Sequence, residues 1–457
     1  MCGIYLLYSK QNKNVNFALN NLTKIQHRGH DSYGMLTKFG KNISVIHEKG
    51  KIKHHSGDER GNLFMGHLRY KTSGLSSENG YQPISSSNNF GKFFFIFNGN
   101  IPCNEYDSMY TLDSIMIKDF FESESYNCKN WDELLIKFVN TYQRAFSIIL
   151  ATEESIFLLK DRYGARPLCY TFSIQSQTIE AASESVGLAF DSTIFEVTSG
   201  EIIGFNTKKI CAPRQIFDFN KENSLINKYG GKCIFEYIYF LNPKTIWNNL
   251  AVEKIRNKWA ESIAAHDIRW KSNNEYIVIG IPTTGISPGI AYAKLLELNY
   301  AQGITKNPEV NRTFILSKEE RDIVSKKKYI YDSDILKDKR VIIIDDSIVR
   351  GVTMKNIVAK IFAENAKEVH IRIISPTIKN ICKYGIDIPT KEELIANKKD
   401  IPEMTEYFGA TSIKFLEIDE MLNVIGQFLP KNTFCSGCFN GDYGDIEDMP
   451  SNLKIKE

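Results

Sequence analysis

The chain has 457 residues, a length typical of two or three domains, and its 42% apolar and 24% charged residues are ordinary for globular protein. Its 57 basic and 54 acidic residues leave a net charge of +3, which predicts no nucleic-acid or membrane partner. No apolar run reaches the roughly 18 to 20 residues of a membrane span, and no signal peptide precedes Cys2, so we expect a soluble cytoplasmic protein.

The first half of the chain predicts a β-rich domain, at 2–230, whose short strands are separated by Gly, Asn and Ser turns. Two helices are expected to interrupt it, at 16–25 and 112–121. The polar stretch 217–232 is expected to be the linker that leaves the domain. The strands are expected at 43–50, 92–100, 146–160 and 201–206.

From about residue 245 strands and helices alternate. Three near-continuously apolar strands, 276–282, 341–346 and 368–375, are typical of a buried parallel sheet. Met354, Ile357, Val358, Ile361 and Phe362 then form one apolar face of a helix between the last two strands. We place an α/β domain at 231–430 and a C-terminal segment with a CxxC motif at 431–457.

The strand VIIIDD ends in Asp345 and Asp346, and the loop SIVRGVT leads from it into the helix. Backbone N–H groups at a helix N-terminus favour an anion such as phosphate. The two carboxylates would repel a phosphate, and they suit ribose hydroxyls or Mg²⁺ instead. A phosphorylated sugar with a metal ion would satisfy both halves of the loop, although an isolated Asp-Asp pair more often only starts a turn.

Cys2 follows the initiator methionine, whose removal is expected because the next residue is small. The thiol and the α-amino group would then belong to one residue. An α-amine has a pKa of about 7.7 to 8.0, close enough to neutrality to take the thiol proton and return it to a leaving amine. The alternative is that Cys2 is a small buried residue at the start of a strand.

The loop VIIIDDSIVRGVTM resembles the phosphoribosyl pyrophosphate (PRPP) loop of type I phosphoribosyltransferases, in the form found in the glutamine PRPP amidotransferase family. The resemblance covers nearly the entire chain and implies a type I phosphoribosyltransferase fold with a parallel sheet for the second domain. It places Asp345 and Asp346 at the ribose and, with Thr284, at Mg²⁺. The remaining PRPP-binding residues that it implies are Ser347, Arg350, Gly351 and Thr353 around the 5′-phosphate, and Lys306 in the flexible loop.

The segments QHRGHDSYG, GHLRYKTSG and FNGN are similar to those of N-terminal nucleophile glutamine amidotransferases. The resemblance implies an α+β domain with four αββα layers and Cys2 as the nucleophile. Asn98 and the N–H of Gly99 would form the oxyanion hole. Arg69 suits the carboxylate of glutamine, Asp113 its ammonium group, and Arg28 would shape the same pocket. The histidines of these segments, His27 and His67, are given no catalytic role.

Together the resemblances imply an amidophosphoribosyltransferase. Ammonia released from glutamine at Cys2 would travel to C1 of PRPP and give 5-phosphoribosylamine, glutamate and pyrophosphate, the first step of purine synthesis. Glutamine and PRPP would be the substrates, Mg²⁺ a cofactor, and the family forms homodimers and homotetramers. The absence of residues before Met1 leads us to expect no propeptide.

Four of the nine cysteines match the ligands of a [4Fe–4S] cluster in one subgroup of this family: Cys233, Cys382, Cys435 and Cys438. They lie far apart in sequence, so no common local motif explains why all four are cysteine. We therefore expect a structural [4Fe–4S] cluster that ties the C-terminal segment to the exit of the first domain. A zinc site with four cysteines and unligated thiols are the alternatives.

The sequence departs from the family pattern at residues that the resemblance places around PRPP. The flexible loop contains Pro308, Glu309 and Asn311 in place of an arginine- and glycine-containing segment, although Lys306 and Arg312 keep some positive charge. Val352, Thr283 and Asn242 also replace family residues. A relative that only senses PRPP or only hydrolyses glutamine is therefore the alternative function. A glutamine amidotransferase of another class is opposed by the DDSIVRG loop.

Overall fold

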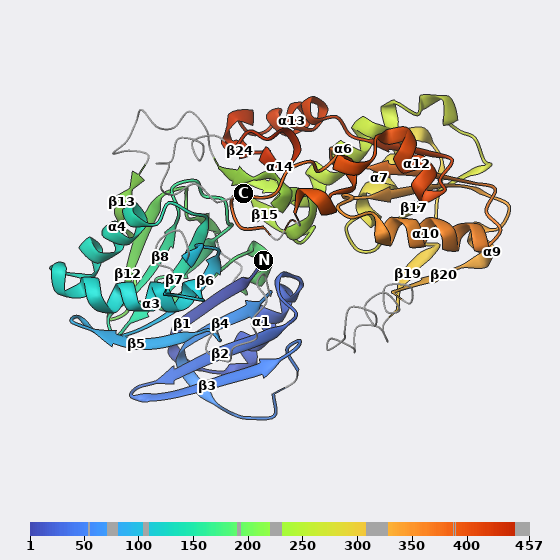
Figure 1. Cartoon of the computed structure of the whole chain (residues 1–457). Coiled ribbons are helices and arrows are strands. Elements are labelled where there is room, and N and C mark those ends of the chain that lie inside the picture. Colours follow the sequence, from blue (N-terminus) through green and yellow to red (C-terminus); the bar gives the residue numbers. More distant parts are fainter. Residues whose placement is uncertain are drawn as a thin grey trace.

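The computed structural model describes residues 1–53, 55–70, 81–103, 109–189, 193–219, 231–307, 328–386, 388 and 390–443. Two domains follow one another along the chain (Figure 1). Most of the predicted linker, 220–230, lies outside the described residues. Its first two residues belong to a strand instead, β13 (Arg214–Asp218), because this segment pairs with β12 (Glu201–Asn206) at the edge of a sheet.

The N-terminal domain contains two antiparallel sheets. The seven-stranded sheet has the order β11-β9-β10-β1-β4-β2-β3, and the six-stranded sheet has the order β13-β12-β8-β7-β6-β5. The first consists of β1 (Gly3–Asn14), β2 (Ser32–Phe39), β3 (Asn42–Lys49), β4 (Arg60–Arg69), β9 (Cys169–Ser173), β10 (Thr178–Ala182) and β11 (Phe195–Glu196). The second adds β5 (Ile84–Asn88), β6 (Gly91–Gly99), β7 (Phe146–Thr152) and β8 (Ser155–Lys160) to β12 and β13.

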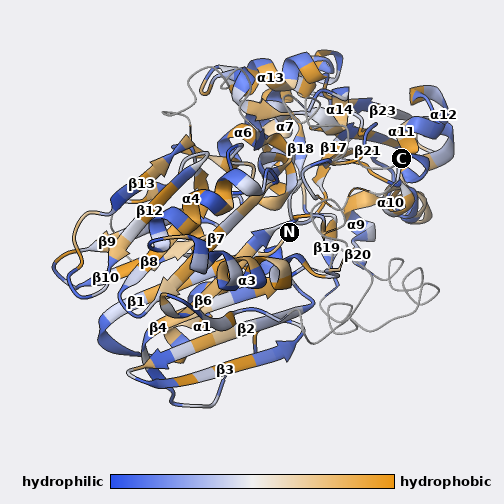
Figure 2. Ribbon diagram, turned by 60° about the vertical axis from the view of Figure 1, so that its left-hand side comes forward, coloured by the Kyte–Doolittle hydropathy of each residue, from blue (hydrophilic) through white to orange (hydrophobic). Residues whose placement is uncertain are grey.

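Apolar side chains fill the space between the sheets, among them Leu6, Phe94 and Ile149, which are wholly buried. The outer face of the first sheet packs against α1 (Val15–Lys24). The outer face of the second packs against α3 (Asp113–Ser123) and α4 (Trp131–Thr141). Hydrophobic residues accordingly run along the central strands (Figure 2). The predicted αββα layering is confirmed.

The expectation of only two helices in this domain is wrong, because α4 is a third. Its sequence carries the necessary signals. The Asn130 side chain caps the helix by accepting a hydrogen bond of 3.0 Å from the N–H of Glu133. Leu134, Leu135 and Phe138 then form the buried stripe.

The second domain is built on a parallel sheet of order β18-β17-β21-β22-β23. Its strands are β17 (Tyr276–Gly280), β18 (Asn299–Tyr300), β21 (Arg340–Asp345), β22 (Glu368–Ile373) and β23 (Ser412–Phe415). One face packs against α6 (Val252–Ala265), α7 (Ile286–Leu296) and α13 (Ile418–Gly426), and the other against α10 (Val352–Ala363) and α12 (Ile401–Phe408). The three predicted apolar strands are β17, β21 and β22, and burial on both faces explains their composition.

The end of the described chain returns to the junction between the domains (Figure 1). There β24 (Phe434–Cys435) pairs in parallel with β14 (Lys232–Cys233), where the chain enters the second domain. The short helix α14 (Gly437–Asn440) follows β24. Among the described residues, none of the helices combines the length and the apolar character that a membrane-spanning helix needs.

Candidate active sites

Cys2 lies directly before β1, at the end of the sheet where β4 ends. Gly3 is paired with Leu68 of β4, so the cysteine is carried to the segment that contains Arg69. The Cys2 thiol is partly exposed, and its Sγ lies 4.0 Å from the carbonyl oxygen of Tyr70. The sheet thus holds the thiol at a strand end, where a substrate can reach it.

The amino terminus itself is buried. Met1 is 7% exposed and packs into the apolar core of the second domain. Burial lowers the pKa of its amino group to about 5, and the nearby cations Arg28 and Arg166 act in the same direction. Burial thus favours the neutral form of the Met1 amine.

The expected oxyanion hole lies at the end of β6. Asn98 is 1% exposed, and among the described residues its Nδ2 has no hydrogen-bond partner. A buried amide nitrogen without a partner is costly, so this donor is available to a ligand. A Cβ on Gly99 would lie 2.6 Å from the carbonyl oxygen of Ala145, so the close approach of β6 to the start of β7 requires glycine there.

Burial raises the pKa of the Asp113 carboxyl to about 6, and the Arg69 guanidinium acts against this shift. Its oxygens accept hydrogen bonds of 3.3 Å from the N–H of Ile101 and 2.8 Å from the N–H of Ser114, which hold it at the start of α3. A cation and a carboxylate are thus available for the two charged groups of an amino acid.

The histidines of these motifs have structural surroundings. His67 is 2% exposed, and burial lowers its pKa to about 3, so it stays neutral. His27 Nε2 lies 2.7 Å from Oε1 of Glu184. Neither arrangement places an imidazole as a base at the thiol.

Arg28 is wholly engaged by protein groups. Its Nε donates to the carbonyl oxygen of Cys2 at 3.1 Å, and its terminal nitrogens donate to Glu184 and Glu236. Arg28 thus contacts the backbone of Cys2 and presents no free guanidinium, while its predicted role in the glutamine pocket stays a prediction. The sequence motifs did not single out Glu236, whose only signal was a glutamate inside an otherwise apolar segment.

The second candidate site lies at the carboxyl end of β21. Asp346 is 5% exposed and accepts hydrogen bonds from the hydroxyls of Thr284 and Ser347. Burial raises the pKa of Asp345 well above its usual range, and the neighbouring Asp346 raises it further. Burial also raises the pKa of Asp346. Two crowded carboxyls of this kind favour a bound cation.

The loop after these carboxyls ends at Gly351, whose φ of +81° favours glycine. Val352 and Thr353 then start α10 with exposed side chains. Arg350, expected at the 5′-phosphate, is exposed and donates to Oε2 of Glu393 at 2.6 Å. The loop is therefore shaped as predicted, while the phosphate role of Arg350 stays a prediction.

Lys306 ends β19 (Ile304–Lys306), which pairs with β20 (Tyr329–Tyr331). Burial lowers its pKa, and the nearby cations Lys328 and Lys51 lower it further. Lys328 also acts on the pKa of both Asp345 and Asp346 and so lies near them. It was not predicted, because it stands in a run of three lysines that reads as a solvated surface. Pro308, Glu309, Asn311 and Arg312 lie outside the described residues.

Two tyrosines lie close to the candidate sites. Tyr239 lies in the helical turn Glu236–Phe240 and is half exposed. Partial burial raises its pKa, and Asp346, Tyr70 and Asp345 raise it further. The carbonyl of Tyr70 faces the Cys2 thiol. Neither tyrosine was predicted.

The four predicted cluster cysteines converge at the junction. Cys233 and Cys435 are register partners in the β14–β24 pair. Burial raises the pKa of the Cys438 thiol, and the three other thiols raise it further. All four cysteines are free of disulfides. Cys382 Sγ accepts hydrogen bonds of 3.3 Å from the N–H groups of Tyr384 and Ile386. In the described part of the chain, no three His, Cys, Asp or Glu side chains are arranged to hold one metal ion.

Comparison with known families matches both halves of the chain. Residues 67–189 match the glutamine amidotransferase domain, and residues 244–386 match the phosphoribosyl transferase domain.

The relatives extend over nearly the whole length. An amidophosphoribosyltransferase of Methanocaldococcus jannaschii is 29% identical, covering 97% of each chain. The chloroplastic amidophosphoribosyltransferase 1 of Arabidopsis thaliana is 30% identical, covering 95% of this chain and 76% of that protein. The solved glutamine PRPP amidotransferase of B. subtilis has a TM-score of 0.81 at 26% identity, covering 97% of both chains. The chain therefore belongs to the amidophosphoribosyltransferase family.

Proposed function

We propose that this chain hydrolyses glutamine at Cys2 and passes the ammonia to C1 of PRPP, giving 5-phosphoribosylamine, glutamate and pyrophosphate, the first step of purine synthesis. The observation that carries the proposal is that one chain holds both candidate sites, the Cys2 thiol directly before β1 and the Asp345–Asp346 pair at the carboxyl end of β21, each within a half of the chain that matches the corresponding domain family. We propose domain boundaries at 2–230, 231–430 and 431–457.

At the first site, removal of Met1 transfers the free amine to Cys2. The amine takes the thiol proton, the thiolate attacks the glutamine amide, and the C–N bond breaks after the proton is returned to the leaving ammonia. Asn98 Nδ2 and the N–H of Gly99 stabilise the oxyanion of the tetrahedral intermediate. Water then hydrolyses the glutamyl thioester. Arg69 and Asp113 hold the charged groups of glutamine.

At the second site, the oxygen donors fit Mg²⁺. Asp345, Asp346 and the Thr284 hydroxyl are hard ligands, and Mg²⁺ characteristically takes one or two carboxylates and completes its shell with water and substrate phosphates. Bound Mg²⁺ would neutralise pyrophosphate charge. Ser347, Gly351 and Thr353 orient the 5′-phosphate, while Lys306 and Lys328 bring positive charge toward the pyrophosphate.

We also propose that Cys233, Cys382, Cys435 and Cys438 hold a [4Fe–4S] cluster. Cys233 and Cys438 are buried, and burial together with the neighbouring thiols raises their pKa values, so their thiolates are unfavourable unless metal compensates the charge. A cluster presents a different iron to each thiolate, so its ligands need not converge on one point. N–H donors to Cys382 Sγ are the kind of contact that tunes cluster sulfurs.

The cluster proposal is tested by iron and acid-labile sulfide analysis of anaerobically purified protein. About four irons and four sulfides per chain, lost in Cys438→Ser, are expected. One zinc per chain, or no metal with four titratable thiols, would contradict it. Cys211→Ser is the matched control, since Cys211 is exposed and is not one of the four.

The main proposal is tested by measuring glutamate and pyrophosphate production from glutamine, PRPP and Mg²⁺. Equal amounts of both products, abolished in Cys2→Ser, are expected. With ammonia as the nitrogen source the same variant should still release pyrophosphate. Glutamate without pyrophosphate, or PRPP binding without turnover, would instead support a relative that only hydrolyses glutamine or senses PRPP.

A further inference from the structure

A chain of buried charges crosses the seam between the domains, beneath Cys2. Arg28, Glu184, Glu236 and Arg166 have side chains that are inaccessible to solvent. Arg28 lies between the two carboxylates, with Nη1 2.8 Å from Oε1 of Glu184 and Nη2 3.1 Å from Oε1 of Glu236. Glu184 follows β10 in the first domain, whereas Glu236 belongs to the helical turn that enters the second.

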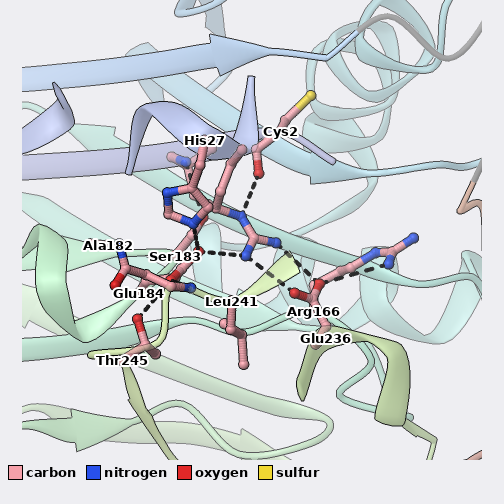
Figure 3. A network of polar contacts seen from close by, with 12 residues as sticks. Cys2, His27, Arg166, Ala182, Ser183, Glu184, Glu236, Leu241 and Thr245 are labelled. Atoms are coloured by element: carbon pink, nitrogen blue, oxygen red, sulfur yellow. Dashed lines mark hydrogen bonds and ion pairs between the residues drawn. The ribbon is translucent and has the colours of Figure 1, made fainter. Parts of the chain in front are cut away.

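The third nitrogen of Arg28 reaches the nucleophile. Its Nε donates to the carbonyl oxygen of Cys2 at 3.1 Å. Figure 3 shows the carbonyl and the thiol of Cys2 pointing in opposite directions, so a hydrogen bond to the carbonyl anchors the Cys2 backbone and leaves the thiol unoccupied. Because the guanidinium is planar, the carboxylates that hold its terminal nitrogens also set the position of Nε.

Glu236 is held from its other side by the first domain. Arg166 Nη1 lies 4.0 Å from Oε1 of Glu236, and Arg166 Nη2 donates to the carbonyl oxygen of Tyr384 at 2.6 Å. The N–H of Tyr384 in turn donates to Cys382 Sγ. Among the described residues, Arg166 Nε and Nη1 have no hydrogen-bond partner, so Arg166 faces Glu236 as an ion pair at 4.0 Å without a hydrogen bond between them.

We infer that Glu236 and Arg166 are positioning residues for Cys2: they hold Arg28 in the one orientation that directs the nucleophile. This inference deepens the proposed function, since it rests on Cys2 being the glutamine nucleophile. Buried charges without water have few ways to be satisfied together, so the network permits one arrangement of the Cys2 backbone. The same groups also set the local potential, because Arg28, Arg166 and Glu236 all act on the pKa of the chain's amino group.

A network with a purely structural role would have a different effect on the reactivity of Cys2. If the charges only joined the domains, their removal would lower stability and leave the reactivity of Cys2 unchanged in the molecules that fold. Positioning requires that the reactivity of Cys2 itself changes. His67 on β4 also faces the amino terminus, but burial keeps it neutral and it supplies no competing charge.

The test compares Glu236→Gln and Arg166→Met with the parent enzyme, after removal of Met1. The rate of Cys2 alkylation by iodoacetamide is measured against pH, with the modified peptide identified by mass spectrometry. Glutaminase kcat and KM are measured in parallel. Glu180→Gln is the matched control, because Glu180 is also wholly buried and bonds to Tyr5 and Asn21 instead of Arg28.

We expect both variants to lower glutaminase kcat by about 10²-fold with little change in KM, as a displaced nucleophile would. The alkylation midpoint should move to lower pH in Glu236→Gln, which leaves excess positive charge, and to higher pH in Arg166→Met. Glu236→Asp should recover part of kcat. Glu180→Gln should change neither quantity.

Unchanged kcat and alkylation profiles in Glu236→Gln and Arg166→Met, or shifts equal to those of Glu180→Gln, would overturn the inference. Ammonia-dependent pyrophosphate release identifies variants that retain a folded second domain. If Arg166→Met fails this check, Glu236→Gln and Glu236→Asp decide the matter. A fully active Cys2→Ser would instead refute the proposed function, so the two failures are distinguishable.

Discussion

Asn98 has a single buried amide nitrogen at the end of β6. Since Nδ2 has no partner among the described residues, we expect it to donate to the developing oxyanion. Asn98→Ala should lower glutaminase kcat by about 10²–10³-fold, because a donor that acts on the transition state is lost. Steady-state glutaminase assays measure this. A raised KM with unchanged kcat would assign Asn98 to ground-state binding instead.

Asp113 makes glutamine binding dependent on pH. Burial raises its pKa to about 6, and the ammonium group of glutamine binds only the ionised carboxylate. Binding is therefore lost as the pH falls through about 6, and kcat/KM for glutamine should then fall about tenfold per pH unit.

The control for this pH dependence is Asp113→Asn, which should have a higher KM at pH 7 and no inflection near pH 6. An identical inflection in that variant would assign the titration to another group.

At the residue scale, the sequence predicts those residues whose role can be recognised from a short motif. Asn98, Gly99 and Asp346 stand at strand ends as their motifs require. Glu236 and Lys328 could not be predicted in the same way, because their roles depend on contacts with residues far away in sequence. Arg28 lies beside Cys2, but the carboxylates that occupy its guanidinium are distant in the chain and could not be predicted.

The turn between β21 and α10 is the element that most directly shapes the phosphate site. Gly351 has a φ of +81°, and a Cβ there would lie 2.6 Å from Ile395 Cδ1. Gly351→Ala should lower the free energy of unfolding by about 1–2 kcal/mol for the left-handed backbone alone. We also expect a higher KM for PRPP, because the clash displaces the loop.

Gly409→Ala is the matched control for the turn. Gly409 has a φ of +66° and open space around its Cβ position, so the variant carries the backbone cost without the clash. Urea unfolding and PRPP titration should show similar destabilisation but an unchanged KM for PRPP. Equal effects of both substitutions on KM would show that loop geometry is not the cause.

Helices and strands could be predicted where buried residues recur at a regular spacing in the sequence. The parallel strands β17, β21 and β22 are apolar on both faces, and α10 carries its stripe at helical spacing. The helix α4 escaped prediction although Asn130 and its apolar stripe signal it. The strands β14 and β24 have two residues each, too few to show a periodic pattern. Their pairing depends on the return of the C-terminal segment.

At the scale of the whole molecule, both reactions depend on the seam between the domains. Glu236 accepts a hydrogen bond from Arg28, the residue that donates to the backbone of Cys2. Three residues further along the same turn, Asp345 and Asp346 act on the pKa of Tyr239. One short helical turn therefore carries residues that interact with groups of both candidate sites. This arrangement follows from domain packing, which motif spacing does not encode.

Tyr239 offers a test of ammonia transfer across this seam. In the parent enzyme glutamate and 5-phosphoribosylamine should form in equal amounts. We expect the Tyr239 ring to line the ammonia path, because Tyr70 of the first domain and Asp345 and Asp346 of the second all act on its pKa. Tyr239→Ala should therefore let ammonia reach water, where it is protonated and lost. The ratio of glutamate to pyrophosphate should rise above one, while ammonia-dependent transfer is retained.

Tyr239→Phe separates the ring from the hydroxyl and should keep the ratio near one if the ring alone excludes water. Tyr126→Ala is the control for loss of an exposed tyrosine, because Tyr126 is 75% exposed and lies in the first domain. Equal ratios in Tyr239→Ala and the parent enzyme would place the ammonia path elsewhere. A ratio raised equally by Tyr239→Phe would show that the hydroxyl, through its position near Asp346, is needed to keep the path closed.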